Sequence, residues 1–233
     1  MNRDRLRLLE ISARLVGGRR YWLAPLLTLV WPAFQAMRLL VGWQQSAFEA
    51  GHVQTALIGF PLIILGIGLG VRIIADEMDR RTLEIAYTVP GGAHRVWLAK
   101  LAAAAGLIIA AALLLAAVCF AIFVSVPLGA LFGAVLQALF YLVLAMGAAT
   151  LTKSEITGAL GAVGVLCFNG LMTGFGQHTT RWAPTFNPLL LVEMDRARVL
   201  AWTIQNRIGL VLAIAALAAL AFARAERREK LLG

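Results

Sequence analysis

The stretch RIIADEMDRRTLEIAYTVPGGAHRVWLAK, residues 72–100, separates two long apolar runs of this 233-residue chain. Six of the nine residues from position 76 to position 84 are charged. An ionised side chain at the centre of a membrane helix costs about 2.5–3.5 kcal/mol, so six would cost on the order of 15 kcal/mol or more. We therefore expect this stretch to lie outside the hydrocarbon, between two membrane spans.

The same stretch predicts a short amphipathic helix over residues 75–90. Acidic and basic side chains alternate every four residues between Asp76 and Glu84, so opposite charges lie on successive turns. A less polar stripe follows helical spacing from Met78 to Val89. The sequence Pro-Gly-Gly at 90–92 then ends the helix. Such a helix presents a charged surface on one side of a membrane.

The composition indicates a polytopic membrane protein. The chain is 61% hydrophobic and only 14% charged, whereas soluble domains carry about 25% charged residues. We predict an all-α fold in one transmembrane domain, residues 1–233, with six membrane spans. The spans are predicted at residues 22–41, 55–74, 96–124, 130–151, 156–175 and 208–222. Within the second, the pattern Gly66-x-x-x-Gly70 lets a neighbouring helix approach closely.

Two further segments are predicted at the membrane surfaces. Residues 1–21 combine six arginines with a regular apolar stripe, which favours an amphipathic helix in the interface; a mobile basic leader is the alternative. No cleavable signal peptide is evident before the first span. The outer segment, residues 176–205, is too apolar for a free loop and too short in any one run to span. We expect helical pieces there, anchored by tryptophans.

The distribution of cations predicts the orientation. Six spans place both termini on the same side, and that side carries 16 of the 21 lysines and arginines. Positive residues concentrate in cytoplasmic loops, so we expect a multi-pass protein of the bacterial cytoplasmic (inner) membrane with both termini inside the cell. This bias also explains the net charge of +9 without nucleic acid as a partner.

The charged stretch resembles a known signature. Residues 77–84, EMDRRTLE, followed by Pro90, His94-Arg95 and Lys100, resemble the cytoplasmic motif of type-2 ABC transporter permeases. That motif has an acidic residue, Gly-Thr-Leu-Glu, a proline-containing turn and a lysine opening the third span. Arg81 stands where the family has glycine. The six-span layout resembles that of the family over the whole chain, whereas the motif covers only residues 77–100.

The resemblance implies a permease subunit of the ABC-2 exporter family. Such a subunit pairs with a second copy or a homologous permease, and each receives a cytoplasmic ATPase that binds ATP and magnesium. This chain contains no G-x-x-x-x-G-K-[ST] motif, so we expect it to hold no nucleotide and to be a transport subunit, not an enzyme. The ATPase contact is predicted at six residues, with a merely solvated charged helix as the alternative: Asp76, Glu77, Arg80, Arg81, Thr82 and Glu84.

Two sets of candidate residues remain in the spans and the outer segment. Gln137 and Tyr141, like Asn169 and Thr173, lie one helical turn apart and could line a substrate path or a subunit interface; hydrogen bonding between helices explains them equally well. The resemblance also implies that the outer segment caps an exit path. Its candidate gate residues are Trp182, Phe186 and Pro188, and an ordered lid without a transport role is the alternative.

Few ionisable residues fall within the spans, which favours a hydrophobic or amphipathic cargo over a highly charged ion. A second function remains open, that of an intramembrane enzyme or an ATPase-independent integral membrane protein. Against the enzyme stands the lack of a clustered acid, histidine or metal-ligand set in the predicted spans.

Overall fold

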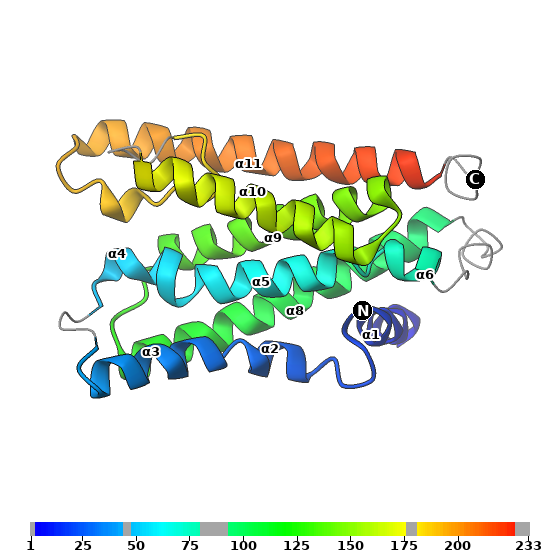
Figure 1. Ribbon diagram of the computed structural model, residues 1–233, viewed down its shortest axis with the longest axis horizontal. Coiled ribbons are helices and arrows are strands. Elements are labelled where there is room, and N and C mark those ends of the chain that lie inside the picture. The colour runs from blue at the N-terminus through cyan, green and yellow to red at the C-terminus, as the bar shows by residue number, and fades with distance from the viewer. Residues whose placement is uncertain (1–2, 44–47, 80–92, 176–180, 227–233) are drawn as a thin grey trace.

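Six helical stretches in the chain are long and apolar enough to cross a membrane (Figure 1). The computed structural model describes residues 3–43, 48–79, 93–175 and 181–226, and these residues form helices and no strand. The predicted all-α fold with six candidate spans is therefore confirmed. The candidate spans are Leu23–Leu40, Ala50–Glu77, Ala93–Ile122, Leu128–Thr152, Glu155–Thr173 and Arg196–Ala225.

The first span is broken into two helices, α2 (Leu23–Leu27) and α3 (Val30–Leu40). The break is expected from Pro32, which has no N–H to donate to the carbonyl one turn earlier. The hydroxyl of Thr28 donates to the Pro25 carbonyl at 2.6 Å, which helps to satisfy the backbone at the bend. Before this span, α1 (Arg3–Gly17) packs against α8 (Ala93–Ile122).

The second span is also interrupted, where one regular helix was predicted over residues 55–74. It comprises α4 (Ala50–His52), the π-helical turn η1 (Val53–Leu57), α5 (Gly59–Gly70) and, after a turn, α6 (Ala75–Asp79). In η1 the Ile58 amide donates five residues back, to the Val53 carbonyl at 3.0 Å. A Cβ on Gly59 would lie 2.0 Å from the Gln54 carbonyl oxygen, so the wide turn requires glycine at this position.

The helix α9 (Leu128–Thr152) is central, because it packs against α5, α8, α10 (Glu155–Phe175) and α11 (Arg196–Ala225). Its contact with α5 is backbone to backbone. A Cβ on Gly66 would lie 2.6 Å from the Ala138 carbonyl oxygen, and one on Gly70 would lie 2.2 Å from that of Leu142. The close approach predicted from the glycine pair is thus present, and α9 is the neighbouring helix.

The sixth span begins earlier than the sequence suggested. The prediction started it at residue 208 and assigned residues 176–205 to an outer segment, but α11 is already helical from Arg196. The reason is local: the Asp195 carboxylate accepts a hydrogen bond from the Arg198 amide at 3.3 Å and caps the helix. With 30 residues, α11 is about 45 Å long, which exceeds the hydrocarbon thickness of about 30 Å.

Both described ends of the chain lie at the same end of the bundle, here named the terminal end (Figure 1). The spans run along the long axis of the molecule, and α1 is seen nearly end-on beside them, so it crosses this axis at the terminal end. The short helix α6 is found at the same end. Placement of α1 in a membrane interface stays a prediction. Of the helix predicted over residues 75–90, only α6 lies within the described residues.

Candidate functional site

The charged stretch begins inside the bundle, not on its surface. After α5 the chain turns through residues 71–74, and Ile73, Ile74 and Ala75 are each fully buried. These apolar residues fix the first turn of α6 against the spans. The acidic residues Asp76 and Glu77 follow in that turn. Carboxylates at the N-terminal end of a helix are stabilised by the helix dipole.

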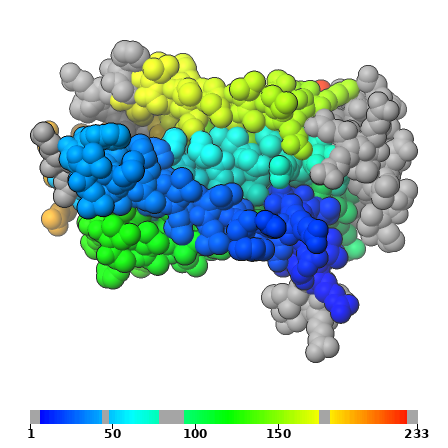
Figure 2. Space-filling model, turned by 60° about the horizontal axis from the view of Figure 1, so that its bottom comes forward, coloured from blue at the N-terminus to red at the C-terminus, as the bar shows by residue number. Residues whose placement is uncertain are grey.

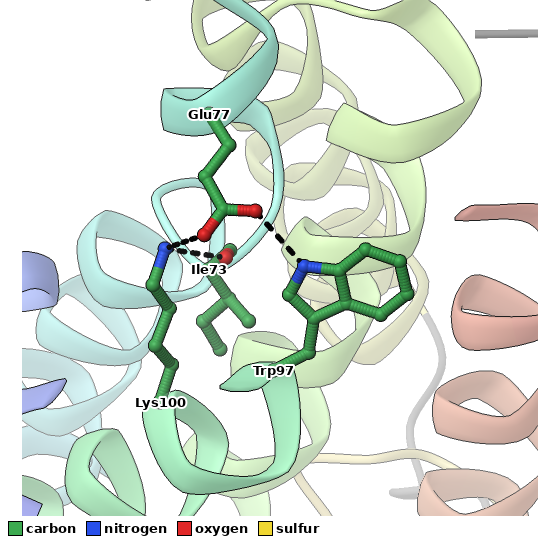
Figure 3. A network of polar contacts seen from close by, with 4 residues as sticks. All are labelled: Ile73, Glu77, Trp97 and Lys100. Carbon is green, nitrogen blue, oxygen red and sulfur yellow. Dashed lines mark hydrogen bonds and ion pairs between the residues drawn. The ribbon is translucent and has the colours of Figure 1, made fainter. Parts of the chain in front are cut away.

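Glu77 forms the centre of a buried polar network (Figure 3). Its Oε1 atom accepts from the Lys100 ammonium at 2.7 Å, and its Oε2 atom accepts from the Trp97 indole nitrogen at 3.0 Å. Lys100 Nζ also donates to the Ile73 carbonyl at 3.2 Å. The Lys100 side chain is 1% exposed and that of Glu77 is 12% exposed. Both charges are therefore paired and hydrogen-bonded away from solvent, as buried ions must be.

This network joins three elements. Glu77 belongs to α6, while Trp97 and Lys100 lie one turn apart in the first turns of α8. The Trp97 ring in turn stacks on Phe222 near the end of α11, with 6.0 Å between centroids and 24° between planes. A displacement of α6 would therefore reach two membrane spans directly. We refer to Ile73, Glu77, Trp97 and Lys100 as the α6 anchor.

The α6 anchor changes the interpretation of the six predicted contact residues. Glu77 points into the bundle, so its carboxylate is not available as a surface contact. Asp76 is half-buried and lines a small pocket with Arg14, Arg19, Arg72 and Glu155. The other four lie outside the described residues: Arg80, Arg81, Thr82 and Glu84.

A second polar cluster occupies the opposite end of the bundle. The Gln54 amide donates to the Phe186 carbonyl at 2.7 Å, and its Oε1 accepts from the Arg207 guanidinium at 3.4 Å. Asn206, beside Arg207 on α11, donates to the carbonyls of Arg181 and Ala183 at 2.9 and 3.0 Å. Amides thus fasten residues 181–187 to η1 and α11.

The predicted gate residues lie in different environments. Phe186 is fully buried, whereas Trp182 is 61% exposed and carries the Arg181 guanidinium 5.1 Å from its ring centroid. Pro188 opens the short 3₁₀ helix η2 (Pro188–Leu190). Between Phe186 and Pro188, the buried Asn187 accepts a hydrogen bond from the Leu189 amide at 3.0 Å and donates one to the Gly51 carbonyl at 2.7 Å. The structure therefore brings Phe186 into the core and leaves Trp182 on the surface.

The predicted path residues are only partly brought together. Gln137 and Tyr141 share a buried face of α9, and neither Gln137 Nε2 nor the Tyr141 hydroxyl finds a hydrogen-bond partner among the described residues. Asn169 lies near Tyr141, but the Asn169 amide donates its hydrogen bond to the Thr185 hydroxyl. Thr173 bonds only to carbonyls of its own helix.

Sequence reasoning missed the partners that hold these sites. It quoted Lys100 as part of a motif but did not pair it with Glu77, and it missed Gln54, Asn187 and Asn206 altogether. The available signal was the presence of amides and a cation inside or beside apolar runs, where each must find a partner. The described residues contain no group of three histidine, cysteine or acidic side chains suited to a metal ion.

No protein-family model, curated protein or solved structure matches this chain.

Proposed function

We propose that the chain is the membrane subunit of an ATP-driven ABC-2 type exporter, working with a separate cytoplasmic ATPase. The observation that supports this most is the α6 anchor, which ties the beginning of the charged stretch to α8 and α11. A partner that moves residues 80–89 would pull on α6, and the buried ion pair would transmit that movement to two spans.

In this exporter the ATPase contact, the nucleotide site and the cargo path lie in different parts of the complex. The charged residues that follow α6 contact the ATPase, which binds ATP and magnesium because this chain has no P-loop motif. A second permease subunit completes the membrane part. ATP-driven closure then only has to favour one arrangement of the spans over another. The cargo is hydrophobic or amphipathic, since the spans contain few ionisable side chains.

The test is purification of the chain from its native membrane in mild detergent, identification of any co-purifying nucleotide-binding protein, and an ATPase assay of the complex. We expect a stable complex whose ATPase activity rises with an amphipathic cargo. The variant E84K should abolish the complex or the stimulation, because it reverses a charge at the predicted contact. R95E is the matched control, since Arg95 is an exposed charge in the same stretch but outside the predicted contact.

Glu77 is not a suitable position for this test. In E77K a second ammonium would face Lys100 in a buried site, and the chain would be destabilised whether or not an ATPase binds. Recovery of the chain without any ATPase, together with unchanged behaviour of E84K, would contradict the proposed function.

A further inference from the structure

A groove on the side of the bundle has the form of a lipid-binding site. It encloses about 950 Å³, near the upper end of the range for ligand pockets, and lies between α2 and α3, α5 and the beginning of α10. In Figure 2 the surface of α5 (cyan) is visible between the N-terminal helices (blue) and α10 (yellow-green). All of its lining residues are apolar except Thr28, Arg72 and Glu155.

The groove is closed at the end away from the termini. The Trp31 indole donates to the Ala56 carbonyl at 2.6 Å, which fixes α3 to η1. Its ring also packs on Phe60 and Phe34, with centroids 4.6 and 5.8 Å away. An occupant therefore enters from the side of the bundle and does not extend past this aromatic cluster.

The terminal end of the groove is charged. Arg72 and Glu155 belong both to the groove and to an adjoining pocket of about 370 Å³, which also contains Arg14, Arg19 and Asp76. The groove and this pocket thus present the guanidinium groups of Arg19 and Arg72, both of which are exposed residues. Arg14 is paired with Glu10 at 2.7 Å, and Arg72 reaches the Val16 carbonyl at 3.5 Å. Arg19 is exposed and lines the pocket mouth, where planar guanidinium groups suit phosphate oxygens.

The dimensions agree with one leaflet of a bilayer. The helix α5, which forms the floor, has 12 residues and is about 18 Å long. One leaflet contributes about 15 Å of hydrocarbon. From the apolar lining, the arginines at the terminal end and the length of α5, we propose that the groove binds one anionic phospholipid from the leaflet on the terminal side. Its acyl chains lie against α5 and its phosphate lies at the arginine pocket.

A second copy of the chain is a poorer occupant. A two-fold axis along the membrane normal would set the two arginine pockets at the same depth, close to each other. Like charges placed together across an interface are unfavourable. A lipid phosphate instead accepts hydrogen bonds from the exposed Arg19 at each pocket mouth. This inference does not require an ATPase partner.

Native mass spectrometry of the full-length, delipidated chain tests the site, with phosphatidylglycerol and phosphatidylcholine as probes. We expect one phosphatidylglycerol to be retained at least about tenfold better than phosphatidylcholine, because both lipids carry the phosphate but the choline cation of phosphatidylcholine is repelled by the pocket arginines. The variants R19Q and R72Q should each reduce that preference, whereas R95Q, a change of an exposed arginine outside the groove, should not.

The groove itself is tested by filling it. Gly68 lines the groove, and a Cβ there meets nothing within 4 Å, so G68F puts a ring into the space without a backbone clash. G106F is the control, because Gly106 on α8 is equally open but does not line the groove. We expect G68F alone to lose the lipid.

Three results would overturn the inference: equal retention of both lipids, retention of phosphatidylglycerol by G68F, or its loss from G106F as well. If G68F instead converts a dimer to a monomer and keeps the lipid, the groove holds a second copy.

Discussion

Lys100 is a cation in a membrane-spanning helix with only 1% of its side chain exposed, and it depends on Glu77 for its charge to be tolerated. We predict that K100M destabilises the folded chain by about 3–5 kcal/mol, because the buried Glu77 carboxylate loses the ammonium group that lies 2.7 Å from it. Thermal unfolding in detergent measures this change.

The double variant E77Q/K100M separates a lost attraction from an uncompensated charge. Because it leaves no lone buried ion, it should be less destabilised than the sum of the two single variants. R95M, which removes an exposed charge from the first turn of α8, should stay within about 0.5 kcal/mol of the parent chain. A K100M chain as stable as R95M would show that the pair does not hold α6.

Trp97 contributes to the α6 anchor in two separable ways. W97F keeps a ring to stack on Phe222 but removes the N–H that donates to Glu77. A hydrogen bond to a charged group contributes about 1.5–3 kcal/mol, so we predict a loss of that size in thermal unfolding. Trp22 is 57% exposed, and W22F serves as the control. Equal stability of both variants would mean that stacking alone matters at Trp97.

At the level of single residues the sequence indicated a role for Glu77 but not its environment. Its place in a run of charges suggested a surface contact with an ATPase, with a solvated helix as the alternative. The order of charges along a helix does not indicate which side chain points into the bundle. Lys100 lies 23 positions away, and only the fold of α5, α6 and α8 brings the two groups within 2.7 Å. The carbonyl groups that Gln54 and Asn187 bind are still farther away along the chain, at 132 and 136 positions.

At the scale of elements, the packing of α5 on α9 depends on two glycines. We predict that G66A and G70A each destabilise the chain by about 1–3 kcal/mol, since the added methyl would overlap carbonyl oxygens of α9. G68A, on the open face of the same helix, should be neutral or slightly stabilising, because alanine favours a helix by up to about 1 kcal/mol over glycine. Chemical or thermal unfolding of the three variants decides, and a cost for G68A equal to that for G70A would contradict this packing.

The segment after α10 is held by Asn187. N187A removes both the donor to the Gly51 carbonyl and the acceptor for the Leu189 amide. We predict faster hydrogen exchange in residues 181–192 and a loss of about 1–3 kcal/mol in stability. N187D keeps the acceptor but places a carboxylate against the Gly51 carbonyl in a fully buried site, so it should destabilise the chain at least as much as N187A. Unchanged exchange in N187A would show that the packing of Phe186 alone fixes the segment.

Most elements could be predicted from hydrophobic runs, and their irregularities could not. Long apolar stretches gave the third, fourth and fifth spans to within a few residues, because length and hydropathy are sufficient to identify a membrane helix. The π-turn at Val53–Leu57 and the early beginning of α11 at Arg196 depend on local hydrogen bonds and caps, which a hydropathy pattern does not register.

Across the whole molecule the two ends of the bundle differ in chemistry. The terminal end combines the α6 anchor with an arginine pocket, and its stability depends on charges that are paired. The opposite end is held mainly by the neutral amides of Gln54, Asn187 and Asn206, which bind backbone carbonyls, with the Arg207 guanidinium bonded to Gln54. Charge-reversing substitutions should therefore lower stability most at the terminal end. At the opposite end, substitutions that remove a side-chain amide should lower stability most.

Because the two ends differ in this way, the proposed function depends on which end of the bundle faces the cytoplasm. Since 16 of the 21 lysines and arginines belong to the terminal side, that side should face the cytoplasm. In a C167S background, which removes the exposed native cysteine, E193C should react with a membrane-impermeant maleimide on intact cells. R95C should react only after the cells are permeabilised, and the background without an added cysteine should not react at all. The reverse labelling pattern would place the charged stretch outside the cell, beyond the reach of any cytoplasmic ATPase.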